Sequence, residues 1–232
     1  MQLKDTVVII TGGTAGIGYA LAKAFKNEGA HVVICADVAE HVKNVSGELG
    51  VTGIVADVTK ESDIENLVAK VTEQFGRIDI WINNAGIFHM FDPNEPFDNE
   101  KAHKIFEVNV FGTIHGSRIA LKQMKQAGSG MIVNILSSIA LDASRGKNTK
   151  IYAASKWAAR GFTEALRGEN KDTAIKILAV YPGGTKTNLY DEKLPDTFDS
   201  YMEPDYVAEK VIENIKLEIP EQDLVIKRPT VQ

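Results

Sequence analysis

The chain has 232 residues, of which 44% are hydrophobic and 25% charged, proportions that are typical of a folded domain and exclude a disordered chain. Its net charge of −5 argues against nucleic acid or an anionic membrane as the main partner, and its single cysteine excludes an internal disulfide. The apolar runs are far shorter than a membrane-spanning helix, and no signal-peptide pattern precedes the first predicted strand, so we expect a cytoplasmic protein.

Short apolar runs alternate with longer amphipathic segments along the chain. The runs predict strands at Val7–Thr11, His31–Ala36, Gly53–Ala56, Asp79–Asn83, Met131–Leu136 and Ala174–Tyr181, with Leu224–Lys227 as a candidate last strand. Apolar residues three to four apart predict helices at Ile17–Glu28, Ser62–Phe75, Lys101–Gln126, Ile151–Glu169 and Asp205–Leu217. This alternation predicts a single α/β domain over residues 1–232, with a Rossmann-type doubly wound parallel sheet.

Two polar segments interrupt the alternation, at about 88–99 and 188–202. Each follows a predicted strand, and ligands of doubly wound sheets bind beyond the carboxyl ends of the strands. We therefore expect both segments to be loops that border the substrate.

The first predicted strand leads into a glycine-rich turn, Thr11-Gly12-Gly13-Thr14-Ala15-Gly16-Ile17-Gly18, and then into a helix. Glycines allow the backbone to approach a pyrophosphate closely, and the helix N-terminus attracts its negative charge. An ordinary strand–helix turn also contains glycines. The strand before the turn and the helix after it nevertheless favour a dinucleotide site.

Asp37 ends the second predicted strand, 19 residues after Gly18. An acid at this distance accepts hydrogen bonds from the adenosine ribose in dinucleotide-binding folds. A carboxylate there repels the 2′-phosphate of NADP, and Ala15 supplies no cation that would attract one. The sequence thus favours NAD over NADP, the alternative being an ordinary surface aspartate.

Tyr152 and Lys156 lie four residues apart in a predicted helix, which places both side chains on one face. An ammonium beside a phenol favours the phenolate and is expected to lower a tyrosine pKa from about 10 toward working pH. Such a tyrosine can serve as a general acid or base. Taken alone, the pair could arise by chance.

Together, these motifs resemble the classical short-chain dehydrogenases/reductases over nearly the whole chain. The resemblance is carried, in chain order, by Thr11-Gly12-x-x-x-Gly16-x-Gly18, Asp57-Val58, Asn83-Asn84-Ala85-Gly86, Asn109, Ser137, Tyr152-x-x-x-Lys156 and Pro182-Gly183-x-Thr185-x-Thr187. Tyr19 stands where the extended branch of the family has a third glycine, which indicates the classical type.

The resemblance implies an NAD(H)-dependent oxidoreductase that interconverts a small-molecule secondary alcohol and a ketone. The catalytic residues that it implies are Asn109, Ser137, Tyr152 and Lys156. The cofactor contacts that it implies are Gly12, Gly16, Ile17, Gly18, Asp37, Asp57, Val58, Asn83, Ala85, Gly86, Tyr152, Lys156, Pro182, Gly183, Thr185 and Thr187.

Each implied catalytic residue has a distinct role. Tyr152 exchanges a proton with the substrate oxygen, and Ser137 hydrogen-bonds that oxygen. Lys156 holds the nicotinamide ribose and keeps Tyr152 acidic, while Asn109 anchors Lys156 through a water. The interval from Ser137 to Tyr152 is longer than the family usually has, which predicts an insertion in Arg145–Lys150. If Ser137-Ser138-Ile139-Ala140 is aligned with the family motif instead, Ser138 becomes the catalytic serine.

Other functions stay open at this level. The chain could be an NADP(H)-preferring carbonyl reductase, or a dinucleotide-sensing protein of the same fold without turnover. A methyltransferase is a weaker alternative, since it predicts neither the Tyr152–Lys156 pair nor the Pro182-Gly183 segment. The five histidines lack ligand spacing, so we expect no metal. We expect a homodimer or homotetramer.

Overall fold

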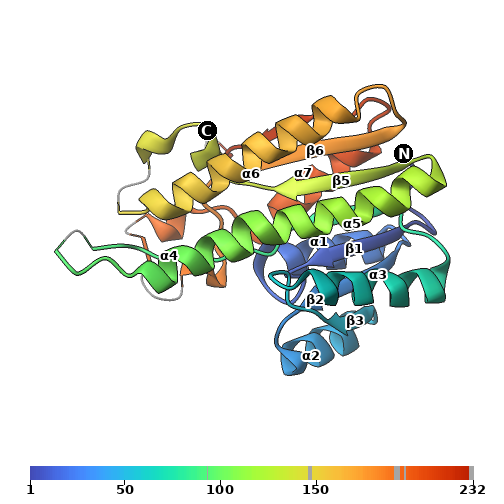
Figure 1. Cartoon of the computed structure of the whole chain (residues 1–232), viewed down its shortest axis with the longest axis horizontal. Helices are drawn as coiled ribbons and strands as arrows, with labels where there is room; N and C mark the ends of the chain where they lie inside the picture. Colours follow the sequence, from blue (N-terminus) through green and yellow to red (C-terminus); the bar gives the residue numbers. More distant parts are fainter. Residues whose placement is uncertain (93, 146–147, 191–193, 196, 230–232) are drawn as a thin grey trace.

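The computed structural model describes residues 1–92, 94–145, 148–190, 194–195 and 197–229 (Figure 1). Residues 93, 191–193 and 196 belong to the two predicted substrate loops, and residues 146–147 belong to the predicted insertion. These parts of the three predictions lie outside the described residues.

One parallel sheet forms the centre of the described chain, with the strand order β3-β2-β1-β4-β5-β6-β7. The strands are β1 (Val7–Thr11), β2 (His31–Ala36), β3 (Thr52–Val55), β4 (Ile80–Asn83), β5 (Gly130–Ile135), β6 (Ile175–Pro182) and β7 (Asp223–Ile226). The order reverses between β1 and β4, and ligands bind at such a switch point. The predicted doubly wound parallel sheet is confirmed, as is the candidate last strand.

Helices cover both faces of the sheet (Figure 1). On one face, α1 (Gly16–Asn27) packs beside α7 (Pro204–Lys216). On the other face lie α3 (Glu61–Phe75), α5 (Gly112–Ala127) and α6 (Lys150–Glu169). Strand β1 contributes to the core on both faces of the sheet. Val8 and Ile10 pack toward the first face, and Val7 and Ile9 pack toward the second. Burial on both faces explains why this strand is apolar throughout.

Helix α2 (Ala39–Leu49) was not among the predicted helices. Val42 is its one fully buried residue, and Val45 and Leu49, three and seven positions further on, pack partly buried against the core, so the helix carries a short apolar stripe that the sequence prediction did not include. In the folded chain, α2 packs beside β3 at the edge of the sheet.

The predicted long helix Lys101–Gln126 is divided in the structure. It consists of α4 (Asn99–Phe106), the π-helical segment η1 (Glu107–Phe111) and α5. Each of these parts follows the one before it without an intervening turn. A π-helical turn inside a helix often marks a functional position, and this one contains Asn109.

The segment after β6 forms the second predicted loop. It contains the short helices η4 (Asn188–Tyr190) and η5 (Phe198–Ser200). Its base is closed by two backbone hydrogen bonds, from Lys186 N to Met202 O (2.8 Å) and from Met202 N to Gly184 O (2.9 Å). In the described ranges, every helix is too short or too polar to cross a bilayer.

Candidate active site

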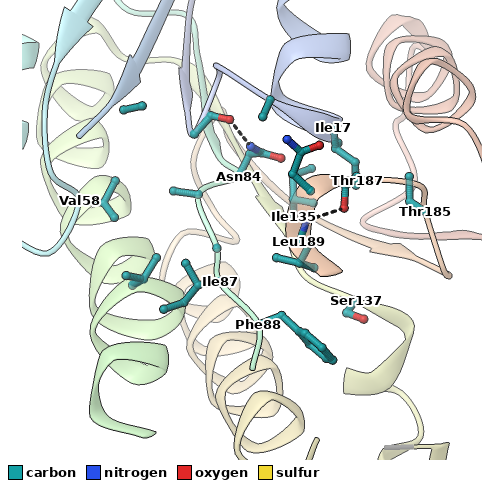
Figure 2. A pocket seen from close by; sticks show the side chains of 18 of the residues that line it. Ile17, Val58, Asn84, Ile87, Phe88, Ile135, Ser137, Thr185, Thr187 and Leu189 are labelled. Atoms are coloured by element: carbon teal, nitrogen blue, oxygen red, sulfur yellow. Dashed lines mark hydrogen bonds between the residues drawn. The ribbon is translucent and has the colours of Figure 1, made fainter. Parts of the chain in front are cut away.

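A cavity of about 500 Å³ lies at the carboxyl ends of the central strands (Figure 2). Most of the site residues predicted from the sequence line it. They are Gly12, Gly16, Ile17, Asp37, Asp57, Val58, Ala85, Gly86, Ser137, Tyr152, Lys156, Pro182, Gly183, Thr185 and Thr187. The tertiary structure thus brings together residues that are scattered over more than 170 positions of the chain.

The glycine-rich turn forms a narrow part of the cavity wall. Gly12 and Gly16 have positive φ angles of 62° and 53°, which strain any residue with a side chain. A Cβ at Gly12 would lie 2.8 Å from the Cα of Ala85, and one at Gly16 would lie 2.9 Å from the Cγ2 of Thr187. A Cβ at Gly18 would overlap the carbonyl oxygen of Gly12, so Gly18 permits α1 to pack on the turn although it does not line the cavity.

The first turn of α1 is open to an anion. Its N-cap residue, Ala15, forms no capping hydrogen bond through its side chain, and the first turn contains no acid. The backbone N–H groups there lack partners within the helix, and the helix dipole adds partial positive charge. The turn and the helix end therefore fit a pyrophosphate.

Asn84 ties the end of β4 to the glycine-rich turn. Its Nδ2 donates to the carbonyl oxygens of Thr11 (2.9 Å) and Gly12 (3.0 Å) (Figure 2). Asn84 lines the cavity, whereas the predicted cofactor contact, Asn83, does not. Asn84 is the first residue after β4, and successive residues of an extended chain point to opposite sides, which explains the difference.

Asn83 belongs to a buried polar network behind the cavity, which we call the Asn83 network. Its Nδ2 donates to Ser117 Oγ (2.8 Å) and Asn134 Oδ1 (2.8 Å), and its Oδ1 accepts from Trp81 Nε1 (2.7 Å). Asn134 in turn donates to Thr163 of α6 (2.9 Å). The structure gives no support to the predicted contact between Asn83 and a cofactor. The Asn83 side chain instead joins buried polar groups behind the cavity.

Two carboxylates line the side of the cavity near β2 and β3. Within the described ranges, Asp37 has no hydrogen bond or ion pair, so its oxygens are available to a ligand. Asp57 Oδ1 accepts from both N (3.0 Å) and Oγ1 (2.7 Å) of Thr59. Burial opposes ionisation of Asp57, but these hydrogen bonds and the nearby Lys104 and Lys60 ammonium groups lower its pKa below the ordinary value.

Tyr152 and Lys156 stand one helical turn apart on α6, and both are buried, with 8% and 5% of their surface exposed. Lys156 Nζ lies 5.8 Å from the centroid of the Tyr152 ring and donates to the carbonyl oxygen of Ile135 (3.1 Å). A hydrogen bond joins the Tyr152 and Ser137 side chains. Ser137 lines the cavity and Ser138 does not, a geometry that favours Ser137 over the alternative serine.

Burial dominates the electrostatics of this pair. It raises the pKa of Tyr152 to about 12, against the opposing effect of the Ser137 hydrogen bond. It also lowers the pKa of Lys156 to about 8. The expectation that Lys156 lowers the Tyr152 pKa is therefore wrong for this structure. The removal of water from both groups is the largest effect on each, and it outweighs the attraction between the ammonium and the phenol.

Asn109 lies in the π-helical segment and is 1% exposed. Its amide clamps the loop after β4, since Nδ2 donates to Ile87 O (3.0 Å) and Oδ1 accepts from Ile87 N (2.8 Å). Nδ2 also donates to Ser155 Oγ on α6 (3.0 Å). A Cβ at Gly86 would lie 3.3 Å from Asn109 Oδ1 and 3.5 Å from Lys156 Nζ, so the three residues converge. The water-linked role of Asn109 stays a prediction.

Both predicted substrate loops reach the cavity. The loop after β4 contributes Phe88 and His89, and the segment after β6 contributes Leu189 and Tyr190. All four lie within the two segments that the sequence predicts to border the substrate, although no motif marks Phe88. Among the described residues, no three His, Cys, Asp or Glu side chains are grouped to hold a metal ion, and the expected absence of a metal stays a prediction.

Comparisons with known proteins agree with this site. The family model described as short chain dehydrogenase matches residues 6–197. D-beta-hydroxybutyrate dehydrogenase of Rhizobium meliloti is 34% identical over 195 residues, which cover 81% of this chain and 74% of that enzyme.

Two solved structures resemble the whole chain. The first is 3-ketoacyl-(acyl-carrier-protein) reductase from Brucella melitensis complexed with NADH (TM-score 0.89, 30% identity, 97% of both chains). The second is an alcohol dehydrogenase from Thermococcus sibiricus complexed with 5-hydroxy-NADP (TM-score 0.87, 27% identity, 99% of both chains). The two similar proteins therefore hold different dinucleotides in one fold.

Proposed function

The chain belongs to the short-chain dehydrogenase/reductase family, and from this premise we propose that it interconverts a secondary alcohol and a ketone with NAD(H). As a member of the family, it is an oxidoreductase that acts on CH–OH groups with NAD(P). The observation that supports the finer proposal is one continuous cavity. The glycine-rich turn and Asp37 line one part of it, and Ser137, Tyr152 and Lys156 line another.

The dinucleotide site of this proposal combines the open first turn of α1 with the glycine-rich turn, Asp37, Asp57 and the segment after β6. A dinucleotide held there would supply the hydride chemistry of the reaction at the carbon that bears the substrate oxygen. Thr187 packs against Gly16, so the segment after β6 closes the cavity beside the pyrophosphate part of the site.

The chain's own residues handle the proton. In ketone reduction the neutral Tyr152 phenol gives its proton to the carbonyl oxygen, and in alcohol oxidation the Tyr152 phenolate takes the hydroxyl proton of the substrate. Ser137 shares a hydrogen bond with the same phenol and stabilises charge that develops on the substrate oxygen. Because burial keeps Tyr152 neutral at ordinary pH, the ligand-free site holds the proton that ketone reduction consumes.

The NAD preference rests on Asp37. Its carboxylate, which has no partner among the described residues, can accept hydrogen bonds from both ribose hydroxyls, whereas a 2′-phosphate would bring like charges together. The Brucella melitensis reductase, with NADH, is the counterpart that fits this proposal. A homodimer or homotetramer stays the expectation for assembly.

Fluorescence titration tests the cofactor part of the proposal. The readout is energy transfer to bound NADH from the two tryptophans of the chain, Trp81 and Trp157. We expect the Kd for NADH to be at least about tenfold lower than that for NADPH, because the repulsion by Asp37 acts on NADPH alone. A tenfold preference for NADPH would contradict the role given to Asp37.

Tyr152→Phe tests the catalytic part. We expect turnover to fall by at least about a hundredfold, because the variant cannot transfer the proton, while the Kd for NADH changes by less than about threefold. Tyr206→Phe removes the same hydroxyl on α7, outside the cavity, and serves as the control. Unchanged turnover in Tyr152→Phe would contradict the mechanism. NADH binding without turnover in the unaltered protein would favour the dinucleotide-sensing alternative.

A further inference from the structure

Aromatic side chains form the wall of the cavity next to Tyr152. The Phe88 ring lies edge-on to the Tyr152 ring at a centroid distance of 5.1 Å and at 75°, and in Figure 2 it extends from the loop after β4 toward Ser137. Tyr190 lies 5.3 Å from Phe88. Phe198 and Tyr201 support Tyr190 from behind, at 6.0 and 5.6 Å. We call Phe88 and Tyr190 the aromatic wall.

The aromatic wall is uncharged. Burial, aided by the nearby Tyr152 and Tyr201 phenols, raises the pKa of Tyr190, so this side chain stays a neutral phenol. Edge-on contacts of this kind leave apolar ring surface for a further ring to pack on. Leu189 and Leu136 also line the cavity and add apolar surface.

The described cavity lining has few cations, and its two lysines are engaged elsewhere. Lys104 acts on Asp57, and Lys156 donates to Ile135 O. His89 is the remaining described lining residue that can carry positive charge, and the described lining contains no arginine. Arg228 lies outside the lining, 4.7 Å from the Tyr201 ring centroid, and donates to Ser200 Oγ. A substrate carboxylate would thus lack the bidentate partner that proteins commonly supply.

From the aromatic wall and this charge distribution, we infer that the substrate is an uncharged ketone, or the corresponding secondary alcohol, with an aromatic or alicyclic ring next to the reacting carbon. The ring packs against Phe88 and Tyr190 while the carbonyl oxygen meets Tyr152 and Ser137. Reduction adds a hydride from NADH to the carbonyl carbon and a proton from Tyr152 to its oxygen. The inference rests on the proposed function and narrows it, away from hydroxy acids.

Three ketones test the substrate class with the purified full chain and NADH. Cyclohexyl methyl ketone carries the ring, 2-pentanone lacks it, and 4-oxopentanoate adds a carboxylate to the shape of 2-pentanone. We expect kcat/KM to be at least about tenfold higher for the cyclic ketone than for 2-pentanone, and at least about tenfold higher for 2-pentanone than for 4-oxopentanoate.

Variants at Tyr190 test the wall itself. Tyr190→Ala is expected to raise KM for cyclohexyl methyl ketone about tenfold, with little change in kcat and less than a threefold change for 2-pentanone. Tyr190→Phe keeps the ring and is expected to retain the unaltered values. Tyr206→Ala, which removes the same side chain outside the cavity, serves as the matched control. NADH titration of each variant shows whether it is folded.

The outcomes separate the inference from the proposed function. Turnover that favours 4-oxopentanoate over 2-pentanone would overturn the inference and leave the proposed function intact. An unchanged KM for the cyclic ketone in a Tyr190→Ala variant that binds NADH would overturn the role of the wall. NADH binding without reduction of any of the three ketones would count against both.

Discussion

At the scale of one residue, the position of Lys156 in the cavity wall lowers the free energy of unfolding of the protein. The side chain is 5% exposed and forms a hydrogen bond to one backbone carbonyl, and burial lowers its pKa to about 8 from 10.5. A buried ammonium costs free energy of folding unless it is well paired. The same burial places it between Tyr152, Gly86 and the dinucleotide part of the cavity, where a cation has chemical use.

Lys156→Met is expected to lose turnover and to change how stability depends on pH. The unfolded chain binds the Lys156 proton more tightly than the folded chain does, so this residue makes stability rise with pH between 8 and 10. The free energy of unfolding of the unaltered protein, minus that of the variant, should rise by roughly 2 kcal/mol over this window. Urea unfolding at pH 8, 9 and 10 measures it. A constant difference would show that the pKa of Lys156 is not lowered.

At the scale of elements, the Asn83 network joins the sheet to the helices on one face. It links β4 through Ser117 to α5, and through Asn134 and Thr163 to α6, the helix that carries Tyr152 and Lys156. All of its side chains are buried, so each polar atom depends on a partner inside the protein. The network therefore couples the position of α6 to that of the sheet.

Asn83→Ala leaves Trp81 Nε1, Ser117 and Asn134 without their present partner. We expect a loss of about 3 kcal/mol in the free energy of unfolding, because unsatisfied buried polar groups keep their desolvation cost. Urea unfolding followed by tryptophan fluorescence measures this loss. Asn44→Ala, at an exposed position of α2, is the control and should cost less than about 0.5 kcal/mol. Equal losses in the two variants would contradict a stabilising network.

At the scale of the whole molecule, the cavity is built from segments that lie far apart in the chain. The glycine-rich turn, the end of β2, the loop after β4, α6 and the segment after β6 all contribute lining residues (Figure 1). A dinucleotide in this cavity would contact several of these segments in the folded state and none of them together in the unfolded chain. Binding should therefore stabilise the whole fold.

Thermal unfolding tests this coupling. NADH at about 100 times its Kd should stabilise the protein by about 2.7 kcal/mol, which for a chain of this size raises Tm by roughly 5–10 °C. NADPH at the same concentration should raise Tm by about half as much, given a tenfold weaker affinity. Asp37→Asn should reduce the difference between the Tm increases caused by NADH and NADPH, since it removes the charge that repels the 2′-phosphate. Equal shifts for both dinucleotides in the unaltered protein would contradict the role of Asp37.

Local patterns in the sequence were sufficient to predict much of this molecule. Strand and helix periods depend on neighbouring residues, so the alternating elements, the glycine-rich turn and the shared helix face of Tyr152 and Lys156 could be read directly. The family resemblance added residues such as Ser137 and Asp57, which do line the cavity. Helix α2 was not predicted, although Val42, Val45 and Leu49 lie three to four residues apart and turn toward the core.

Tertiary structure decided the features that depend on distant contacts. Asn84 faces the cavity, whereas its neighbour Asn83 is held behind it by Ser117 and Asn134, which lie far away in the sequence. Phe88 and Tyr190 form one wall although they are 102 positions apart in the sequence. The pKa of Tyr152 rises because packing from several elements removes water, an effect that no spacing motif contains. Periodicity is local and belongs to the sequence, whereas burial is a property of the assembled fold.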